Sequence, residues 1–493
     1  MKVLQIWGAI SLIIIFAFLL SWQPIFALAF LLGVIFVAIS FINPYLATYL
    51  IAILIPFVDL MSSKWMPEEY TAIIKFASEI SVGILLLTIF IRKAVQKEKF
   101  LFNHAYLYFS LFLLLSVLSI IANQVDIEHF TFGLTVIIRY IFLFFTVSQL
   151  KWDKKKLKTF YGVMIGIGLF QILISLGQVI IGDSFKSIFA VEVKRAISST
   201  TVYSIERQSL DLAWVFGTFS RYNLLGGFLM LWLDLVFAGL FIVRSKFHKF
   251  GLSVALISGI VVLILSNSRN SWIGTFFGFM SILILLNKRK VVAIASIVVV
   301  SLAMLLVSVY EPVSLSITES SGATPVERFL GVFSGEYIQK SLQNDRLFLI
   351  SKASQQVIAY KPLLGVGMGS AWSSQEAAFG DFKYGVLLGL PVDAWYYLGD
   401  VGWIAIMTQV GLLGLVAFLG FIISLYSQAS KLLKRYFGIE KVLIVSFLAM
   451  IVAMIITNIW SFNFTYRSVS FYFWLVGGVV FSFFGRSKKE QIS

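Results

Sequence analysis

The sequence predicts an all-α polytopic membrane protein with about 14 transmembrane helices. Three observations support this prediction. Hydrophobic residues make up 59% of the chain and charged residues 13%, and the mean hydropathy is +0.93. Apolar runs of about 20 residues recur from end to end, and each is long enough to cross a hydrocarbon core. The basic residues lie in short clusters between these runs.

The apolar runs are expected to form spans in chain order. The first run follows Lys2, lacks a small-x-small cleavage site and leads directly into further spans. We therefore interpret it as a retained anchor and not as a signal peptide. The predicted spans lie near residues 3–21, 24–42, 44–60, 71–91, 103–122, 129–149, 159–181, 222–243, 250–266, 270–287, 291–310, 402–426, 441–460 and 468–484.

Lysine and arginine predict the orientation, because cytoplasmic segments of membrane proteins are enriched in both. An even number of spans places both termini on one side. If that side is the cytoplasm, every basic cluster falls there, including Arg92 to Lys99, Lys151 to Lys158 and Lys431 to Lys441. Most of the net charge of +15 is then explained by topology, and it implies no nucleic-acid partner.

The same assignment divides the chain into five parts. These are seven N-terminal helices (1–182), an extracytoplasmic loop (183–221), helices 8 to 11 (222–310), a large extracytoplasmic loop (311–401), and the last three helices with a cytoplasmic tail (402–493). Long ordered loops often carry function on a rigid scaffold, so we expect the chemistry at the extracytoplasmic face. Cysteine is absent and the three histidines are scattered, which excludes a thiolate or histidine-rich metal centre.

Two arginines are expected on this outer face. Arg269 lies in a tight turn between two apolar runs. It is either an interfacial arginine that extends to lipid headgroups or a functional cation at the membrane edge. Arg346 begins a helical pattern that runs to Tyr360, and on a helical period it shares one stripe with Ile350, Ala353, Val357 and Tyr360. It should meet an anion, which is either a ligand phosphate or a loop carboxylate such as Glu327.

A glycine-rich segment follows this helix at residues 361–370. Because no Rossmann-type helix follows it and it lies outside the cytoplasm, we reject dinucleotide binding. Aromatic residues come next: Trp372, Trp395, Tyr396, Tyr397 and Trp403. An interfacial aromatic belt explains Trp403, whereas Trp372 and Trp395 to Tyr397 can instead stack on sugar faces.

Asp400 stands just before an apolar helix. It is either the N-cap of that helix or a group that accepts a proton from a hydroxyl. Within the spans, Lys75 is expected to pair with Glu79, one turn away. Arg139 is expected either to brace a lipid site or to pair with Asp234.

The order of these motifs resembles the O-antigen ligase / O-antigen polymerase superfamily. The resemblance covers roughly residues 205–425. It rests on four segments of this sequence: the Gly-Thr-Phe stretch at 217–219 with Asn223, the Ser-Arg-x-x-Trp turn at 268–272, the Arg346 helix that leads into Pro-Leu-Leu-Gly-Val-Gly at 362–367, and the Asp400-Val401-x9-Gly-Leu-Leu-Gly unit at 400–414.

The resemblance implies an inverting, metal-independent glycosyl transfer from an undecaprenyl-diphosphate-linked oligosaccharide, at the outer face of the bacterial cytoplasmic (inner) membrane and on a GT-C-like fold. It implies no cofactor. Arg269 and Arg346 match the functional arginines that would hold the diphosphate, and Arg221 is a further candidate. The ligases have a histidine where this chain has Asp400, which favours a repeat-unit polymerase over a ligase. A flippase and a chain-length regulator are the expected protein partners.

A lipid-linked oligosaccharide flippase is the alternative from another class. Fourteen helices with both ends inside also suit a secondary transporter. Such proteins commonly contain two similar halves, and this sequence shows no repeat of that kind. A large outer loop with an inward-facing arginine also favours the enzyme.

Overall fold

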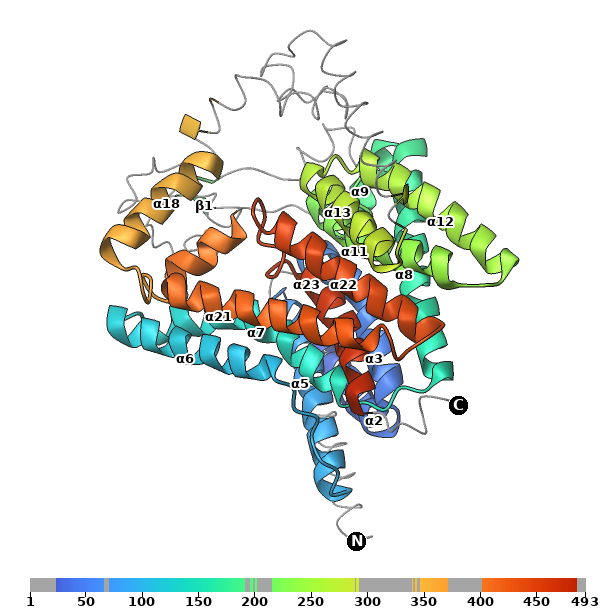
Figure 1. Ribbon diagram of the computed structural model, residues 1–493, viewed down its shortest axis with the longest axis horizontal. Helices are drawn as coiled ribbons and strands as arrows, with labels where there is room; N and C mark the ends of the chain where they lie inside the picture. Colours follow the sequence, from blue (N-terminus) through green and yellow to red (C-terminus); the bar gives the residue numbers. More distant parts are fainter. Residues whose placement is uncertain are drawn as a thin grey trace.

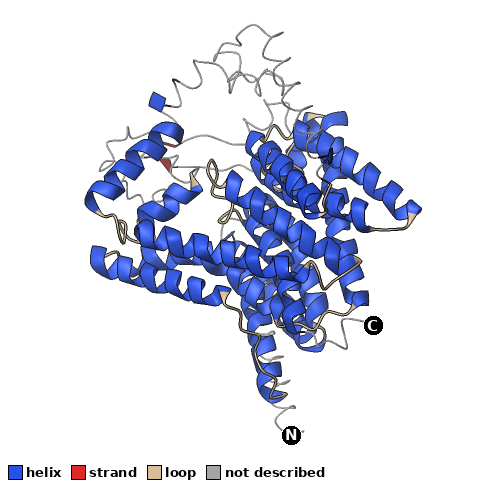
Figure 2. Ribbon diagram, viewed as in Figure 1, coloured by secondary structure: helices blue, strands red, loops and turns tan. Residues whose placement is uncertain are grey.

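The structure is a computed structural model that describes residues 24–65, 71–190, 196–197, 200–201, 215–288, 290–291, 339, 342–343, 346–370 and 401–485. These residues form a bundle of packed helices (Figure 1). Figure 2 shows that helix predominates throughout this part of the chain. The described strands are β1 (Ala196–Ile197) and β2 (Thr200–Thr201), which pair antiparallel.

The N-terminal region contributes α2 (Pro24–Ile42), α3 (Pro44–Leu54), η1 (Ile55–Phe57), α4 (Val58–Leu60), η2 (Met61–Trp65), α5 (Thr71–Val95), α6 (Ala105–Asn123), α7 (Ile127–Ser148), α8 (Lys154–Ile180) and α9 (Asp183–Phe189). The remainder contributes α11 (Tyr222–Ile242), α12 (Lys246–Leu265), α13 (Arg269–Leu285), α18 (Arg346–Tyr360), α21 (Gly402–Leu432), α22 (Ile439–Thr457), α23 (Arg467–Phe481) and η5 (Ser482–Gly485).

Nine helices in the described ranges are long and apolar enough to cross a membrane. They account for nine of the fourteen predicted spans. Three other predicted spans, near 24–42, 44–60 and 270–287, are shorter apolar helices, and α13 has 17 residues. The span near 3–21 lies outside the described residues, as does nearly all of 291–310. The total of 14 therefore remains a prediction.

The predicted span at 44–60 is interrupted. The α3 helix ends at Leu54, and a 3-10 turn follows over Ile55–Phe57. Pro56 explains the break, because proline lacks a backbone N–H and its ring clashes with the preceding helical turn. The segment consequently stays helical from Pro44 to Leu60 but changes from α-helix to 3-10 helix and back at Pro56.

The core of the bundle consists of α11, α22 and α23. Of the apolar window in α23, 89% is buried inside the protein, compared with 28% in α5 and in α12. Close approach between the helices depends partly on glycine: Gly227 of α11 lies against Val469 of α23, and Gly274 of α13 lies against Met230 of α11. Small residues of this kind allow membrane helices to approach closely. The outer helices present their apolar faces to the surroundings.

The predicted basic clusters gather at one end of the bundle. Lys93 of α5 donates to Gln149 at the end of α7 over 3.1 Å, and Tyr45 at the start of α3 donates to the Lys151 carbonyl. Lys151 also forms an ion pair with Glu98. This pairing lowers the pKa of the Glu98 carboxyl. We call this end the basic end and the opposite one the site end.

An ion-pair network lies toward the site end, and it corrects two predicted pairs. Glu79 of α5 is bound by Arg139 of α7 at 2.9 Å and by Arg467 of α23 at 3.4 Å. Arg467 also pairs with Asp59 at 3.3 Å. The predicted Lys75–Glu79 pair is wrong because the two arginines reach Glu79 from neighbouring helices. Lys75 contributes its backbone carbonyl to Arg467.

The second corrected pair is Arg139 with Asp234. Asp234 lies in the middle of α11, is fully buried, and has both carboxylate oxygens without a hydrogen-bond partner. It faces Gly278 of α13, where an added Cβ would lie 2.4 Å from Oδ1. The described structure therefore contains both a multiply paired carboxylate, Glu79, and a fully buried carboxylate without a hydrogen-bond partner, Asp234.

This contrast generates a matched stability prediction. Glu79→Gln should lower the free energy of unfolding by about 3 kcal/mol, because removing one partner of a buried network leaves uncompensated charge. Asp234→Asn should cause no loss, since it replaces an unpaired carboxyl with a neutral amide of the same shape. Thermal unfolding in detergent measures both. An equal loss in the two variants would contradict the assigned network.

Candidate functional site

The turn between α12 and α13 presents Arg269 at a helix start. The backbone reverses at Asn267, which adopts φ +58°, and Ser268 precedes the first helical residue, Arg269. The Trp272 indole donates to the Leu263 carbonyl over 2.8 Å and closes the turn. The predicted tight turn is thus confirmed, and the partly buried Arg269 lies at the positive end of the α13 dipole.

Arg221 occupies the corresponding place on α11, where it is the N-cap residue. Two glutamines of α8 hold the segment that leads into it. Gln178 Oε1 accepts from the backbone N–H groups of Phe216 and Gly217, both at 3.0 Å, and Gln171 Oε1 accepts from Thr218 N–H. The Gly-Thr-Phe motif is therefore a buried segment that is hydrogen-bonded to α8, and these bonds set the position at which α11 begins.

The starts of α11 and α13 touch one another. A Cβ added at Gly226 would lie 2.4 Å from Ser268 Cβ and close to Ser271. Arg221 and Arg269 are consequently brought to the same end of two packed helices. Each helix start has unsatisfied N–H groups and a positive partial charge, and each carries a guanidinium. This arrangement suits a phosphate or another multiply charged anion.

The C-terminal end of α22 joins this site to the start of α21. The Thr457 carbonyl accepts from Asn270 Nδ2 of α13 at 3.0 Å. The next carbonyl, of Asn458, accepts from Trp403 N of α21 at 3.3 Å. The C-terminal end of α22 therefore contacts both α13, which begins with Arg269, and α21, which follows Asp400.

Buried amides without hydrogen-bond partners concentrate here. The Oδ1 atoms of Asn223, Asn267 and Asn270, and both polar side-chain atoms of Asn458, are buried and have none. Such groups are rare in folded proteins because each costs desolvation free energy. Their concentration at one end of α11, α13 and α22 marks a polar site at the ends of apolar helices.

A second feature of the site end is a bend in α21. Gly411 has φ +73° and ψ −174°, which are not helical values. The bend releases backbone groups that a continuous helix would pair internally. The 362–367 segment binds all four: the carbonyls of Thr408 and Gln409 accept from Val366 N and Gly367 N, at 2.8 and 3.0 Å, and the N–H groups of Leu412 and Leu413 donate to the carbonyls of Pro362 and Leu363.

We call this arrangement the glycine lock, formed by residues 362–367 and 408–413. Two positions of the lock require glycine for two reasons: the backbone φ is positive there, and a Cβ atom would not fit. Gly365 has φ +64°, and a Cβ there would lie 2.4 Å from the Thr408 carbonyl oxygen. A Cβ at Gly411 would lie 2.2 Å from the Leu363 carbonyl oxygen. Asn123 at the end of α6 donates to the Gly365 carbonyl over 3.0 Å and ties the lock to a third helix.

The lock determines where α18 lies. The predicted helix from Arg346 to Tyr360 is confirmed, and Figure 1 shows it beside the bent start of α21. Its buried face consists of Leu349, Ala353 and Val357, whereas Tyr360 is 74% exposed. The predicted apolar stripe is therefore wrong at Tyr360, which lies beyond the part of α18 that packs. Arg346 is partly buried at the helix start.

The structure describes three of the eight predicted site residues. Arg221 and Arg269 come together, whereas Arg346 lies on α18, which packs against α21 and is separate from α13 in Figure 1. Asp400, Trp372, Trp395, Tyr396 and Tyr397 lie outside the described residues. Trp403 differs from the belt interpretation, because its indole donates to the Ile455 carbonyl and its ring packs against Phe418 and Phe464.

Sequence reasoning missed the 457–467 segment. It contains Thr457 and Asn458, which join α13 to α21, and Arg467, which anchors the segment through Glu79. Arg139 also donates to the Thr465 carbonyl at 2.7 Å. The sequence did contain a sign of this segment, because the polar residues Asn458 and Asn463 lie where one apolar run ends and before the next begins. In the described ranges, no group of three or more His, Asp or Glu side chains is placed to hold a metal ion.

These features define a multi-pass membrane protein with a cationic site at the ends of its helices. Residues 252–419 match the family described as O-antigen ligase (Wzy_C). The match confirms the predicted resemblance to the O-antigen ligase / O-antigen polymerase superfamily, and it includes most of α12 and all of α13, α18 and the glycine lock. A comparison with curated proteins gave no match.

The glycine lock generates a prediction with an internal control. Gly365→Ala and Gly411→Ala should each lower the unfolding temperature sharply, because an added Cβ meets backbone oxygen in addition to the left-handed φ. Gly182→Ala provides the control: Gly182 has φ +79° but nothing within 4 Å of an added Cβ. Gly182→Ala should lower the free energy of unfolding by about 1 kcal/mol, which is the cost of the backbone conformation alone. Equal losses in all three variants would show that the lock contributes nothing beyond backbone conformation.

Proposed function

We propose that the protein is a polysaccharide polymerase that joins undecaprenyl-diphosphate-linked oligosaccharide repeat units. The observation that carries this proposal is the contact between the starts of α11 and α13, which gathers Arg221, Arg269 and two helix N-termini at one polar end of a membrane bundle. A lipid diphosphate matches that place because its charge needs cations while its tail stays in the bilayer. The O-antigen ligase family match over 252–419 supports a glycosyl-transferring enzyme.

In the proposed reaction, an acceptor hydroxyl oxygen attacks the anomeric carbon of the donor sugar from the face opposite the diphosphate. The bond between that carbon and the diphosphate oxygen breaks, and the electron pair leaves with undecaprenyl diphosphate. The hydroxyl proton passes to Asp400. The product is inverted at the anomeric carbon, and the chemistry requires neither a metal nor a nucleotide.

The arginines act on the leaving group. Negative charge on the diphosphate grows as the bond breaks, so guanidinium groups fixed beside it stabilise the transition state more than the ground state. Arg269 and Arg221 are held by helix starts whose positions are set by packing. In this proposal Arg346 also binds the diphosphate, which requires α18 to approach α13 more closely than it does in Figure 1. Trp372, Trp395, Tyr396 and Tyr397 stack on sugar faces.

The proposed orientation places the site end outside the bacterial cytoplasmic membrane. The basic end then faces the cytoplasm, as the enrichment of lysine and arginine in cytoplasmic segments favours. A flippase would supply the lipid-linked donor, and a chain-length regulator would act on the growing polymer. The buried amides of Asn270 and Asn458 suit sugar hydroxyl groups, since an amide both donates and accepts.

A ligase that transfers the finished glycan to a different acceptor is the second candidate, and the match to a family described as O-antigen ligase favours it. Asp400 in place of the ligase histidine favours the polymerase. The two reactions share a donor and a leaving group, and they differ only in the acceptor. Product analysis therefore separates them.

The test uses purified protein in liposomes with undecaprenyl-diphosphate-linked repeat units and no added metal or nucleotide. The wild-type protein should give a polymer ladder with release of undecaprenyl diphosphate. Arg269→Gln and Arg346→Gln should each reduce the rate by about a hundredfold, the typical cost of removing one charge-stabilising donor. Lys352→Gln is the matched control, because Lys352 is an exposed cation on α18, and it should retain activity.

Three other results would overturn the proposal in different ways. Product that forms only when a separate acceptor lipid is added indicates a ligase. Movement of the lipid-linked unit between leaflets without product indicates a transporter. An unchanged ladder in both arginine variants, with correct folding, would remove the arginines from the mechanism.

A further inference from the structure

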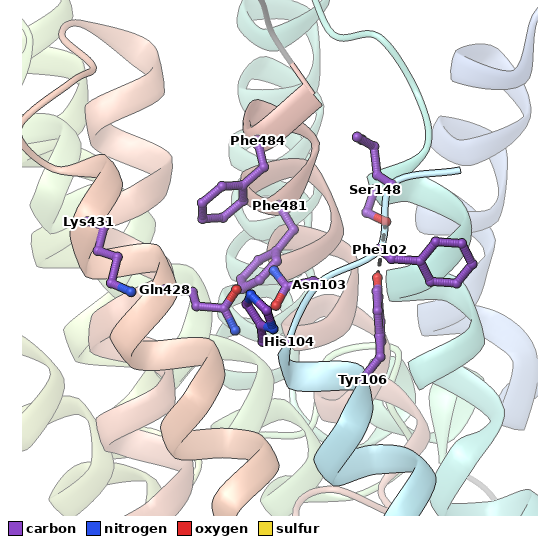
Figure 3. A pocket seen from close by; sticks show the side chains of 10 residues that line it. Phe102, Asn103, His104, Tyr106, Ser148, Gln428, Lys431, Phe481 and Phe484 are labelled. Carbon is purple, nitrogen blue, oxygen red and sulfur yellow. Dashed lines mark hydrogen bonds between the residues drawn. The ribbon is translucent and has the colours of Figure 1, made fainter. Parts of the chain in front are cut away.

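A cavity lies at the basic end, at the opposite end of the bundle from the arginine site (Figure 3). It has a volume of about 310 Å³. Four segments line it: the approach to α6, the end of α7, the last turns of α21, and the end of α23 with η5. The cavity is therefore formed where four helix ends meet at the level at which apolar spans give way to basic segments.

The polar part of this cavity is cationic. Lys431 of α21 and His104 before α6 line it, together with the amides of Asn103 and Gln428. Figure 3 shows the Lys431 ammonium directed toward Gln428, with His104 and Asn103 across the cavity. Among the described residues that line it there is no carboxylate. Its polar groups can thus donate several hydrogen bonds to an anion without electrostatic opposition from within the lining.

Neighbouring carboxylates are already paired. At this end Glu98 is paired with Lys151 and Asp153 with Lys156. The pKa of the Asp153 carboxyl is lowered, mainly by its hydrogen bond from the Lys156 backbone N–H. The excess of lysine and arginine at the basic end therefore remains available to attract an anion.

The apolar part of the cavity is aromatic. Phe481 and Phe484 cover one side, whereas the ring of Phe102, which is 80% exposed, points away from Lys431 and Gln428 in Figure 3. A free phosphate ion gains nothing from these rings, whereas a phospholipid does, because its glycerol and first acyl carbons lie directly below the headgroup.

We propose that this cavity binds the headgroup of an anionic phospholipid. Lys431 and His104 contact the phosphate, Asn103 and Gln428 hydrogen-bond to phosphate or glycerol oxygens, and Phe484 packs against the glycerol and first acyl carbons. Cationic pockets between transmembrane helix ends are suited to such headgroups. The inference is independent of the glycosyl-transfer proposal, because it uses the opposite end of the bundle.

Lipid titration of the purified full-length protein tests it. Phosphatidylglycerol should raise the unfolding temperature in detergent, and phosphatidylcholine should not, because its headgroup carries no net negative charge. Lys431→Gln should weaken phosphatidylglycerol binding about fivefold, the loss expected for one lysine at a membrane surface. Lys434→Gln is the matched control, since Lys434 is exposed on the same stretch of chain but does not line the cavity.

Two further arms separate a lipid from a free anion. Glycerol 1-phosphate should cause little stabilisation, and Phe484→Ala should weaken phosphatidylglycerol binding. Stabilisation by glycerol 1-phosphate equal to that by the lipid would overturn the lipid assignment. Equal losses of phosphatidylglycerol affinity in the Lys431 and Lys434 variants would show that the lipid is attracted by the charged surface in general. That result would overturn the proposal that the cavity is the binding site. No difference between the two lipids would overturn the proposal altogether.

Discussion

The bend of α21 at Gly411 is the constraint on which the outer part of the structure depends. Inside a bilayer a backbone N–H or carbonyl without a partner costs several kcal/mol, so a helix cannot open there unless other groups pair with it. Residues 362–367 supply those partners, donating through two N–H groups and accepting through two carbonyls. The same bonds fix the end of α18 against α21 and against Asn123 of α6. The position of Arg346 therefore follows from backbone pairing more than from side-chain packing.

A second set of constraints comes from parts of the chain that the family match does not include. The matched segment supplies Arg269, α18 and the lock, but the framework around Arg269 is built by α8, α11 and the 457–467 segment. Gln171 and Gln178 set the start of α11, and Asn270 binds the end of α22. The Glu79, Arg139 and Arg467 network then holds the 457–467 segment to α5 and α7. The arginine site thus depends on contacts between helices far apart in sequence.

The two ends of the bundle use positive charge in different ways. At the candidate site the cations are arginines that sit at helix starts, where the dipole adds to their charge. At the basic end they are mostly lysines on helix ends and connecting segments, and many are exposed. Fixed guanidinium groups suit a diphosphate held in one geometry, because arginine presents its donors in a rigid fork. Flexible ammonium groups suit diffuse attraction to a membrane surface.

The sequence by itself determined the helical membrane architecture, because span length and apolar composition are local properties that the bilayer imposes on each segment. It also indicated Arg269, as a charge at the edge of an apolar run, and the Arg346 helix, from its periodic pattern, while the family resemblance added Arg221. Only the tertiary structure decided the partners. Glu79 binds two arginines instead of Lys75, Asp234 has no partner, and Trp403 points into the bundle. Spacing along one helix shows which residues share a face. It does not show which face of another helix, hundreds of residues away, will pack against them.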